Sequence, residues 1–311
     1  MQTPLDVLKQ YYRFENFRGL QEPIISSVLE GNDTFGLMPT GGGKSVCFQI
    51  PALMQEGICL VVSPLIALMK DQVQSLQKKN IKAMAIMGNL RTDEISDLLD
   101  NALYGNYKFL YLSPERLQQD WVLQRITALP INLIAIDEAH CVSQWGHDFR
   151  PAYLNIKQLR VHFYKIPFLA LTASATQHVK DDVIKQLELK QPKIFQSSFE
   201  RPNIVYSVTE TQDKFYHIEQ ILRKQPSPSI IYVRNRKSCV EFSSNLNAIG
   251  IKATFFHGGL SLSDKDKHMN LWMDEKVQVI VATNAFGMGI DKANVQNVIH
   301  IQLPENLESY Y

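Results

Sequence analysis

Short apolar runs alternate with longer amphipathic stretches along the whole chain, and this order restricts the fold more than any other feature. The run ICLVVS, for example, leads into LIALMKDQVQSLQKK, in which apolar residues recur at the spacing of a helix. An order of strand, helix and strand implies parallel sheets with right-handed crossover connections. Strands are predicted at 34–38, 58–63, 108–112, 132–137 and 168–173, and then at 203–208, 229–233, 253–257, 277–283 and 297–302.

The chain has 311 residues, which is long for one domain and suits two domains that each bury a core. The stretch 196–204, QSSFERPNI, is polar, contains a proline and separates the two series of predicted strands. We therefore expect an α/β protein with two tandem lobes, residues 1–200 and 201–311. Each lobe should contain a mostly parallel sheet flanked by helices.

Composition excludes several classes of protein. Hydrophobic residues make up 45% and charged residues 20% of the chain, as in an ordinary globular protein. No apolar run reaches membrane-spanning length, and the segment MQTPLDVLKQ lacks the features of a signal peptide. The four cysteines are scattered, so we expect no zinc site and a cytoplasmic location, associated with the nucleoid if the protein is bacterial. The net charge is +1, so nucleic-acid binding would depend on local patches.

The segment MPTGGGKS lies between a predicted strand and a helical stretch, which is the context of a phosphate-binding P-loop. It departs from the pattern G-x-x-x-x-G-K-[ST] because Met38 replaces the first glycine, although Pro39 can help to shape that turn. The glycines would turn N–H groups toward phosphate, Lys44 would reach the β/γ-phosphates, and Ser45 would bind Mg²⁺. The alternative is a glycine-rich turn with a solvated lysine. The predicted ATP-binding loop comprises Thr40, Gly41, Gly42, Gly43, Lys44 and Ser45.

A second segment, INLIAIDEAH, ends a predicted buried strand with two acids. The carboxyl ends of parallel strands share one edge of a sheet, so these acids should lie beside the P-loop. We expect Asp137 to hold magnesium and Glu138 to activate the attacking water, as ATP-hydrolysing motors require. With Lys44, they form the predicted catalytic set. The alternative is a pair of solvated acids at a strand end.

The ordered motifs of the chain resemble those of RecQ-type DNA helicases of superfamily 2. The matching segments are MPTGGGKS, VVSPLIALMKDQV, YLSPERL, DEAHCVSQWGHDFRPAY, LTASAT, SFERPNI and VATNAFGMGIDKANV. The resemblance implies two RecA-like lobes and an ATP- and Mg²⁺-dependent motor that moves 3′ to 5′ on single-stranded DNA and unwinds duplexes. Single-stranded and partly duplex DNA would therefore be its partners, whereas the sequence indicates no protein partner and no membrane.

The segment FENFRGLQ, upstream of the P-loop, resembles the adenine-recognition element of the family, and the resemblance implies an N-terminal adenine-recognition helix in the first lobe. The ring of Phe14 can stack on a base, and the amide of Gln21 can both donate and accept hydrogen bonds at an adenine edge. Arg18 could assist near the base or the phosphates. The alternative places Phe14 and Phe17 in the core as part of an N-terminal helix.

Residues 141–151, CVSQWGHDFRP, combine aromatic side chains with an arginine next to the predicted ATPase edge. Such a combination suits stacking on unpaired bases, and in RecQ enzymes this loop senses DNA and couples it to hydrolysis. The alternative is that the aromatic side chains simply fill the lobe. The candidate residues are Trp145, His147, Phe149 and Arg150.

Further positions resemble family motifs that contact DNA or couple the lobes. The segments VVSPL, YLSPERL and FFHGG resemble phosphate-gripping elements that offer hydroxyl and N–H groups to phosphate, although S-P is also ordinary turn chemistry. The candidate residues in them are Ser63, Pro64, Ser113, His257 and Gly258. Arg234, Arg236 and Lys237 form a predicted basic rim, with Arg234 at a position where the family more often has a polar residue. Ser174 and Thr176 resemble the motif that links hydrolysis to lobe movement, and Gly289 and Asp291 resemble one that faces the nucleotide.

Family members continue beyond the final segment NLESYY into a motif that carries an arginine finger, and also have zinc-binding and winged-helix modules. The resemblance therefore implies that residues 1–311 bind ATP–Mg²⁺, hold single-stranded DNA weakly, hydrolyse slowly and fail to unwind. Two other functions stay open. One is a translocase on double-stranded DNA without strand separation, and the other is a nucleotide-gated DNA-binding fragment with little turnover.

Overall fold

The computed structural model describes residues 2–88, 90–146, 148–198, 203–287, 290 and 292–303. The chain divides into two compact units, Met1–Glu200 and Arg201–Tyr311. Within the described residues, no helix is both long and apolar enough to cross a bilayer.

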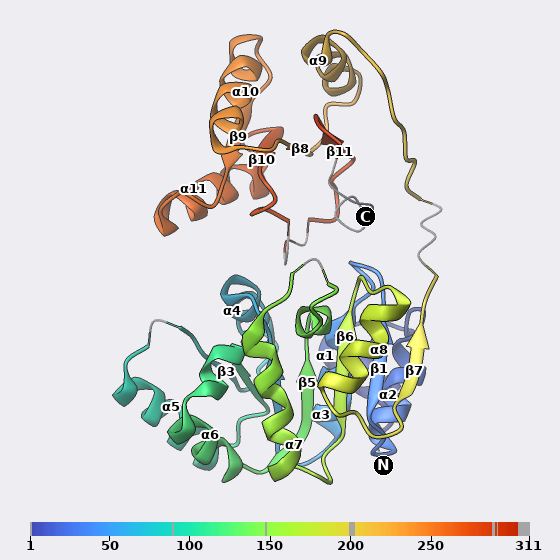
Figure 1. Cartoon of the computed structure of the whole chain (residues 1–311), viewed down its shortest axis with the longest axis vertical. Coiled ribbons are helices and arrows are strands. Elements are labelled where there is room, and N and C mark those ends of the chain that lie inside the picture. Colours follow the sequence, from blue (N-terminus) through green and yellow to red (C-terminus); the bar gives the residue numbers. More distant parts are fainter. Residues whose placement is uncertain are drawn as a thin grey trace. The chain divides into compact units, whose positions relative to one another are not determined.

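A seven-stranded, all-parallel sheet forms the centre of the first unit (Figure 1). Its strands lie in the order β3-β4-β2-β5-β6-β1-β7, so the chain crosses over between successive strands. Parallel strands need such crossovers, which the amphipathic stretches supply as helices. The strands are β1 (Thr34–Leu37), β2 (Ile58–Val62), β3 (Ala83–Ile86), β4 (Phe109–Leu112), β5 (Ile131–Ile136), β6 (Phe168–Thr172) and β7 (Lys193–Gln196).

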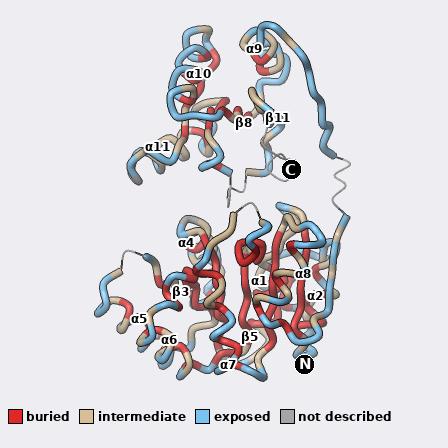
Figure 2. The backbone as a smooth tube through the Cα atoms, viewed as in Figure 1, coloured by how far each residue is buried: buried red, intermediate tan, exposed pale blue. Residues whose placement is uncertain are grey.

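Helices cover both faces of this sheet, which explains why its central strands are buried along their whole length (Figure 2). In β2, Leu60 and Val62 pack against α5 to α8, while Cys59 and Val61 pack on the face covered by α2 to α4. The α-helices are α1 (Pro4–Tyr12), α2 (Gln21–Leu29), α3 (Lys44–Met54), α4 (Ile66–Gln77), α5 (Thr92–Tyr104), α6 (Asp120–Thr127), α7 (Gln158–His162) and α8 (Gln177–Gln186), and the 3₁₀ segments are η1 (Pro114–Gln118), η2 (Ala139–Val142) and η3 (Pro151–Lys157).

Helix α1 adds an outer layer that fixes the chain just before the P-loop. It starts with a capping box in which Thr3 and Asp6 satisfy each other's backbone N–H groups. Its apolar residues Val7 and Leu8 pack on Ile25 of α2 and Ile50 of α3. The short connector from α1 to α2 is thereby held next to α3, the helix that follows the P-loop.

The second unit contains a four-stranded parallel sheet in the order β11-β8-β10-β9 (Figure 1). Helices α9 and α10 pack on one face, around Ile231 and Val281, whereas α11 packs its buried Trp272 on the other face against Phe256 and Ile280. Its strands are β8 (Ser229–Tyr232), β9 (Ala253–Phe256), β10 (Val279–Ala282) and β11 (Asn297–His300), and its helices are α9 (Lys214–Lys224), α10 (Arg236–Ala248) and α11 (Leu262–Met273).

The structure differs from the strand predictions at three places. Residues 203–208 are not a strand: they lie in irregular chain outside both sheets of the described residues, with Val205 and Val208 exposed. Two short strands, β3 and β7, were not predicted. Strand β3 has the sequence AMAI, and β7 has the sequence KIFQ at an edge of the sheet, so neither carries a run of strong β-formers.

Candidate functional site

Three neighbouring strands bring the predicted nucleotide motifs to one edge of the first sheet. Strand β6 lies between β1 and β5, and all three are parallel, so their carboxyl ends meet at the same edge. The P-loop follows β1, Asp137 follows β5, and Thr172 ends β6. In open α/β sheets this edge is where ligands bind.

The P-loop adopts a conformation that depends on its glycines. Gly41 and Gly43 have φ angles of +75° and +73°, in the left-handed region that side chains disfavour. A Cβ at Gly42 would lie 2.9 Å from the carbonyl oxygen of Pro39, to which the Gly42 N–H donates. Helix α3 begins directly after Gly43, so its free N–H groups and positive end face the loop.

Met38, which replaces the usual first glycine, belongs to the core. Its side chain is buried against Cys47 of α3, with the two sulfur atoms 3.6 Å apart. Its N–H donates to the carbonyl oxygen of Thr172, which extends the pairing of β1 with β6. A large apolar residue therefore fits at this position, and the turn that follows is made by residues 39–43.

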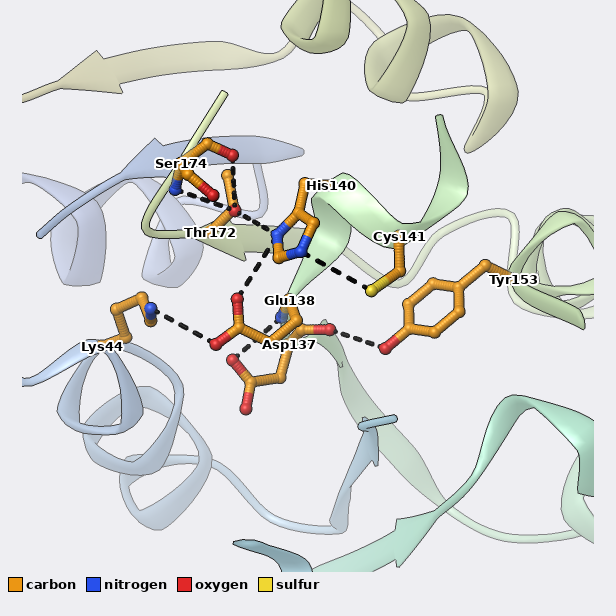
Figure 3. Close-up of polar contacts among 8 residues, drawn as sticks. All are labelled: Lys44, Asp137, Glu138, His140, Cys141, Tyr153, Thr172 and Ser174. Atoms are coloured by element: carbon orange, nitrogen blue, oxygen red, sulfur yellow. Dashed lines mark hydrogen bonds and ion pairs between the residues drawn. The ribbon is translucent and has the colours of Figure 1, made fainter. Parts of the chain in front are cut away.

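Figure 3 shows that Lys44 points toward the acid pair. Its Nζ lies 3.6 Å from Oε1 of Glu138, and both side chains are mostly buried. The other carboxylate oxygen of Glu138 lies 3.4 Å from Nδ1 of His140. The P-loop cation and the second acid, which are distant in sequence, are thus brought together, as the two motifs predicted.

Asp137 is almost fully buried, with 4% of its surface exposed. Its Oδ1 accepts a hydrogen bond from the N–H of Glu138 at 3.0 Å. Burial, followed by the charge of Glu138, raises the pKa of Asp137 to about 7, against a smaller lowering effect of Lys44. A buried carboxylate with a raised pKa gains most from a nearby cation, which fits the predicted magnesium ligand.

A histidine that the sequence reasoning did not assign connects the acid pair to the LTASAT segment (Figure 3). Nδ1 of the buried His140 lies 2.8 Å from Oγ1 of Thr172. The histidine tautomer decides which of these two atoms donates the hydrogen bond. Oγ1 of Thr172 donates to the carbonyl oxygen of Ser174 and accepts from its N–H. The predicted coupling residue Ser174 therefore contacts the site through Thr172, whereas Thr176 caps α8 by accepting from the N–H of Val179. Only the position of Thr172 at the end of a predicted strand could have indicated its role.

The side chain of Gln21, at the start of α2, contacts the backbone of the P-loop. Its Nε2 lies 3.2 Å and 3.3 Å from the carbonyl oxygens of Gly42 and Gly43, and its Oε1 accepts from the N–H of Arg18. A Cβ at Gly43 would collide with this amide. Gln21 thus supports the P-loop backbone in addition to any contact with a base.

Residues 14–20 of the adenine element form a connector, and only Gln21 belongs to a helix, as the first residue of α2. Phe14 and Arg18 therefore do not lie on the predicted N-terminal recognition helix. Phe14 is 44% exposed, so the alternative that places it in the core is wrong. The guanidinium carbon of Arg18 lies 5.1 Å from its ring centroid. Phe17, by contrast, packs partly buried against the α1–α2–α3 cluster. Phe14 and Arg18 are therefore available at the surface near the P-loop.

Trp145 is 78% exposed, so the alternative in which it fills the lobe is wrong. The backbone N–H of Trp145 donates to Oγ of Ser143. Phe149 is half-buried, and His147 lies outside the described residues. Arg150 is also half-buried, and its Nη1 donates to the carbonyl oxygen of Pro64 at 2.8 Å. In this conformation Arg150 anchors the loop, and the side chain of Trp145 faces solvent.

Three predicted phosphate contacts are buried in the first unit. Ser63 has 1% of its surface exposed, and Ser113 and Pro64 are buried as well. These turn residues complete the core that β2 and β4 begin. Their contact with a DNA phosphate stays a prediction.

The second unit has a basic pocket of about 790 Å³ at the start of α10. Asn235 caps this helix, and its side chain accepts from the N–H of Ser238. No acid is among the described residues that line the pocket. His257 is half-buried next to it, while Gly289 and Asp291 lie outside the described residues. The lining residues are Arg234, Asn235, Arg236, Lys237, Gly258, Thr283 and Ala285.

Comparison with known proteins agrees with these motifs. Residues 18–182 match the DEAD/DEAH box helicase family, and residues 213–311 match the helicase conserved C-terminal domain. The ATP-dependent DNA helicase RecQ of Pasteurella multocida is 41% identical over an alignment that covers 100% of this chain and 49% of that protein. The probable ATP-dependent DNA helicase RecS of Bacillus subtilis is 40% identical, with 97% of this chain and 62% of that protein covered. The chain thus spans about half the length of the curated relatives it matches, or somewhat more.

Solved structures share the fold of this chain. The helicase Lhr of Mycobacterium smegmatis, bound to ssDNA and AMP-PNP, matches 99% of this chain and 45% of its own with a TM-score of 0.77 and 18% identity. Dbp5 of Saccharomyces cerevisiae, bound to RNA and ADP BeF3, matches 98% of this chain and 81% of its own with a TM-score of 0.73 and 18% identity. At such low sequence identity the structural similarity shows the fold alone, and it confirms the prediction of RecA-like lobes.

The resemblance to RecQ-type helicases is confirmed by relatives that align with nearly the whole chain. The match to the DEAD/DEAH box helicase family covers more than half of the 311 residues. The chain therefore belongs to the DEAD/DEAH box helicase family.

Proposed function

We propose that this chain is the ATP-driven motor core of a RecQ-type DNA helicase. The observation that carries the proposal is the approach of Lys44 to Glu138 at the carboxyl edge of the sheet. It joins a phosphate-binding loop to a pair of acids in one buried site. Neither motif alone would distinguish a motor from another nucleotide-binding protein.

The residues of this site suit ATP and magnesium. Mg²⁺ prefers oxygen ligands and accepts one or two from a protein together with substrate phosphates. Ser45, in the first turn of α3, and the buried Asp137 would supply these oxygens. A bound magnesium ion would neutralise charge on the phosphate oxygens. Lys44 would hold the β/γ-phosphates, and Glu138 would orient a water and accept its proton.

Base recognition would occur at the connector between α1 and α2. The exposed ring of Phe14 and the guanidinium of Arg18 offer two flat surfaces for stacking. Gln21 would contact the adenine edge while its amide supports the P-loop. Specificity for ATP would then depend on the same side chain that keeps the loop in shape.

DNA binding would use one element in each unit. The basic pocket of the second unit combines Arg236 and Lys237 with the backbone of Gly258, a set that suits a phosphate backbone. Trp145 offers an exposed aromatic surface for an unpaired base. Translocation from 3′ to 5′ and duplex unwinding are proposed from the similarity to RecQ enzymes. A cytoplasmic location, at the nucleoid in a bacterium, is part of this proposal.

Hydrolysis with and without single-stranded DNA tests the proposal. The rate is measured with protein in excess over ATP, so that slow turnover is also detected, and Glu138→Gln is the matched inactive control. We expect single-stranded DNA to accelerate hydrolysis by wild type and not by the control. Equal rates for wild type and Glu138→Gln would contradict an ATPase and leave a nucleotide-gated binding module.

A strand-displacement assay separates the remaining possibilities. A version extended through the arginine-finger motif of the family should unwind a duplex with a 3′ single-stranded tail in the presence of ATP, but not one with a 5′ tail. Residues 1–311 by themselves should unwind neither. Hydrolysis stimulated by blunt duplex DNA, without displacement of either tailed substrate, would favour a translocase on double-stranded DNA.

A further inference from the structure

The peptide group between Asp137 and Glu138 is held in an unusual backbone geometry. Glu138 has φ of 47° and ψ of 48°, in the left-handed region that a residue with a Cβ rarely occupies. Such a strained conformation persists only where surrounding contacts enforce it, and it is concentrated at functional sites. The contacts that enforce it here therefore bear on the orientation of both acids.

Both polar ends of that peptide group are bound. Its N–H, from Glu138, donates to Oδ1 of Asp137 at 3.0 Å. Its carbonyl oxygen, from Asp137, accepts a hydrogen bond from the hydroxyl group of Tyr153 at 3.0 Å (Figure 3). The first contact is local, whereas the second comes from η3, a separate segment. Tyr153 is fully buried, so solvent cannot replace its hydroxyl group.

Tyr153 also closes the loop that carries Trp145. The loop leaves the acids through η2, whose first turn is capped by Glu138, and Cys141 donates its N–H to the carbonyl oxygen of Glu138. The loop returns through Arg150. The backbone N–H of Arg150 donates to the carbonyl oxygen of Cys141, and the carbonyl oxygen of Arg150 accepts from the backbone N–H of Tyr153. Both ends of the loop are therefore tied to the peptide group between the two acids.

We propose that Tyr153 is a positioning residue, which sets the orientation of the Asp137–Glu138 peptide group and transmits the state of the Trp145 loop to it. The inference rests on the proposed ATPase function. A displacement of the loop by a base would move η3 and hence the hydroxyl group of Tyr153. The acid that activates water would then respond to DNA without touching it.

Tyr153→Phe tests this role, because it removes the hydroxyl group and keeps the packing of the ring. We expect the hydrolysis rate at saturating ATP to fall by about tenfold or more, as for other residues that orient metal-binding groups. The dissociation constants for ATP and single-stranded DNA should stay within about twofold, since no residue that binds either is removed. The acceleration of hydrolysis by DNA should also be smaller.

Tyr111→Phe is the matched control. Tyr111 is likewise fully buried in the first unit, but its hydroxyl group donates to Gln72 and not to the acids. Loss of a buried hydroxyl group should lower the melting temperature of both variants, whereas only Tyr153→Phe should lower the rate per ATP-binding molecule. Replacing Tyr153 with 4-aminophenylalanine, which restores an N–H donor, should recover most of the rate.

Two results would overturn the inference. One is a wild-type rate and wild-type DNA acceleration in Tyr153→Phe, counted per molecule that binds ATP. The other is an equal loss in Tyr153→Phe and Tyr111→Phe, which would mean that the hydroxyl group only stabilises the fold. If wild type hydrolyses no faster than Glu138→Gln, the proposed ATPase function fails, and the inference fails with it.

Discussion

Nζ of Lys44 lies 3.6 Å from Oε1 of Glu138. The cation expected to bind the phosphates of ATP is thus paired with the acid expected to activate water. Nucleotide binding would have to separate them, and the separation would leave Glu138 free to act on a water molecule. The pair therefore links phosphate binding to the availability of the base.

Glu138→Gln should abolish hydrolysis and strengthen ATP binding. The amide cannot accept a proton, so the rate should fall by about 10²-fold or more. It also removes the carboxylate that competes with phosphate for Lys44, so the dissociation constant for ATP should decrease. Single-turnover hydrolysis measures the rate, and equilibrium titration measures the dissociation constant for ATP. Weaker ATP binding in this variant would show that the Lys44–Glu138 pair does not compete with nucleotide.

The raised pKa of Asp137, about 7 through burial and the charge of Glu138, should make stability depend on pH in the absence of metal. The folded state then binds the proton more tightly than the unfolded state, in which the carboxyl group has its ordinary pKa of 3.8. The stabilising contribution of the protonated group is complete below about pH 4 and is lost as the pH rises to about 7, at roughly 1 kcal/mol per pH unit.

Asp137→Asn isolates this effect, because every other titrating group remains. The unfolding free energy of wild type minus that of Asp137→Asn should decrease between about pH 4 and pH 7. Magnesium should stabilise wild type more at about pH 8 than at about pH 5, since only the ionised carboxylate binds it. A difference that is flat with pH would contradict the raised pKa.

Gln21→Ala should reduce both the affinity for ATP and the preference for ATP over GTP. The amide donates to the carbonyl oxygens of Gly42 and Gly43, so its loss should loosen the loop as well as the base contact. Competition titrations with the two nucleotides measure both effects. Gln72→Ala, which removes a glutamine that bonds to Tyr111, is the control and should leave the preference unchanged. An unchanged ATP-to-GTP ratio in Gln21→Ala would argue against a role in base recognition.

Trp145→Ala should weaken the response to DNA without destabilising the protein. Stacking on a base is worth about 1–3 kcal/mol, so affinity for single-stranded DNA should fall by about fivefold or more. Because Trp145 is 78% exposed, the melting temperature of Trp145→Ala should differ little from that of wild type. Tyr104→Ala removes an equally exposed aromatic side chain from the end of α5 and serves as the control. Equal DNA binding and stimulation in the two variants would exclude stacking by Trp145.

The strands that could be predicted are those that their own residues identify, without knowledge of the strands they pair with. Strand β2 is a continuous apolar run, and β5 is one apart from Asn132; both are covered on both faces, so composition identified them. Strand β3 consists of alanine, methionine and isoleucine, and its pairing with β4 depends on the neighbour more than on its own residues. Residues 203–208 are rich in β-branched and aromatic side chains, as a strand is, but they belong to neither sheet of the described residues.

The candidate site shows the same division. The P-loop and the acids follow predicted strands directly, so parallel pairing predicted that Lys44 and Glu138 would meet. The contacts of Thr172 with His140 and of Tyr153 with Asp137 join separate segments through buried side chains, and no spacing in the sequence indicates them. Arg150 was predicted to contact DNA because its charge suggested a ligand, yet its guanidinium group donates to Pro64.

Equilibrium binding of ATP–Mg²⁺ to wild type and to Lys44→Ala tests the central claim most directly, namely that the P-loop and the acid pair form one nucleotide site. Lys78→Ala, which removes an exposed lysine at the end of α4, is the control. Loss of the phosphate-binding cation should weaken ATP binding by about thirtyfold or more, while the control binds as wild type does. Equal affinity of wild type and Lys44→Ala for ATP–Mg²⁺ would contradict the account.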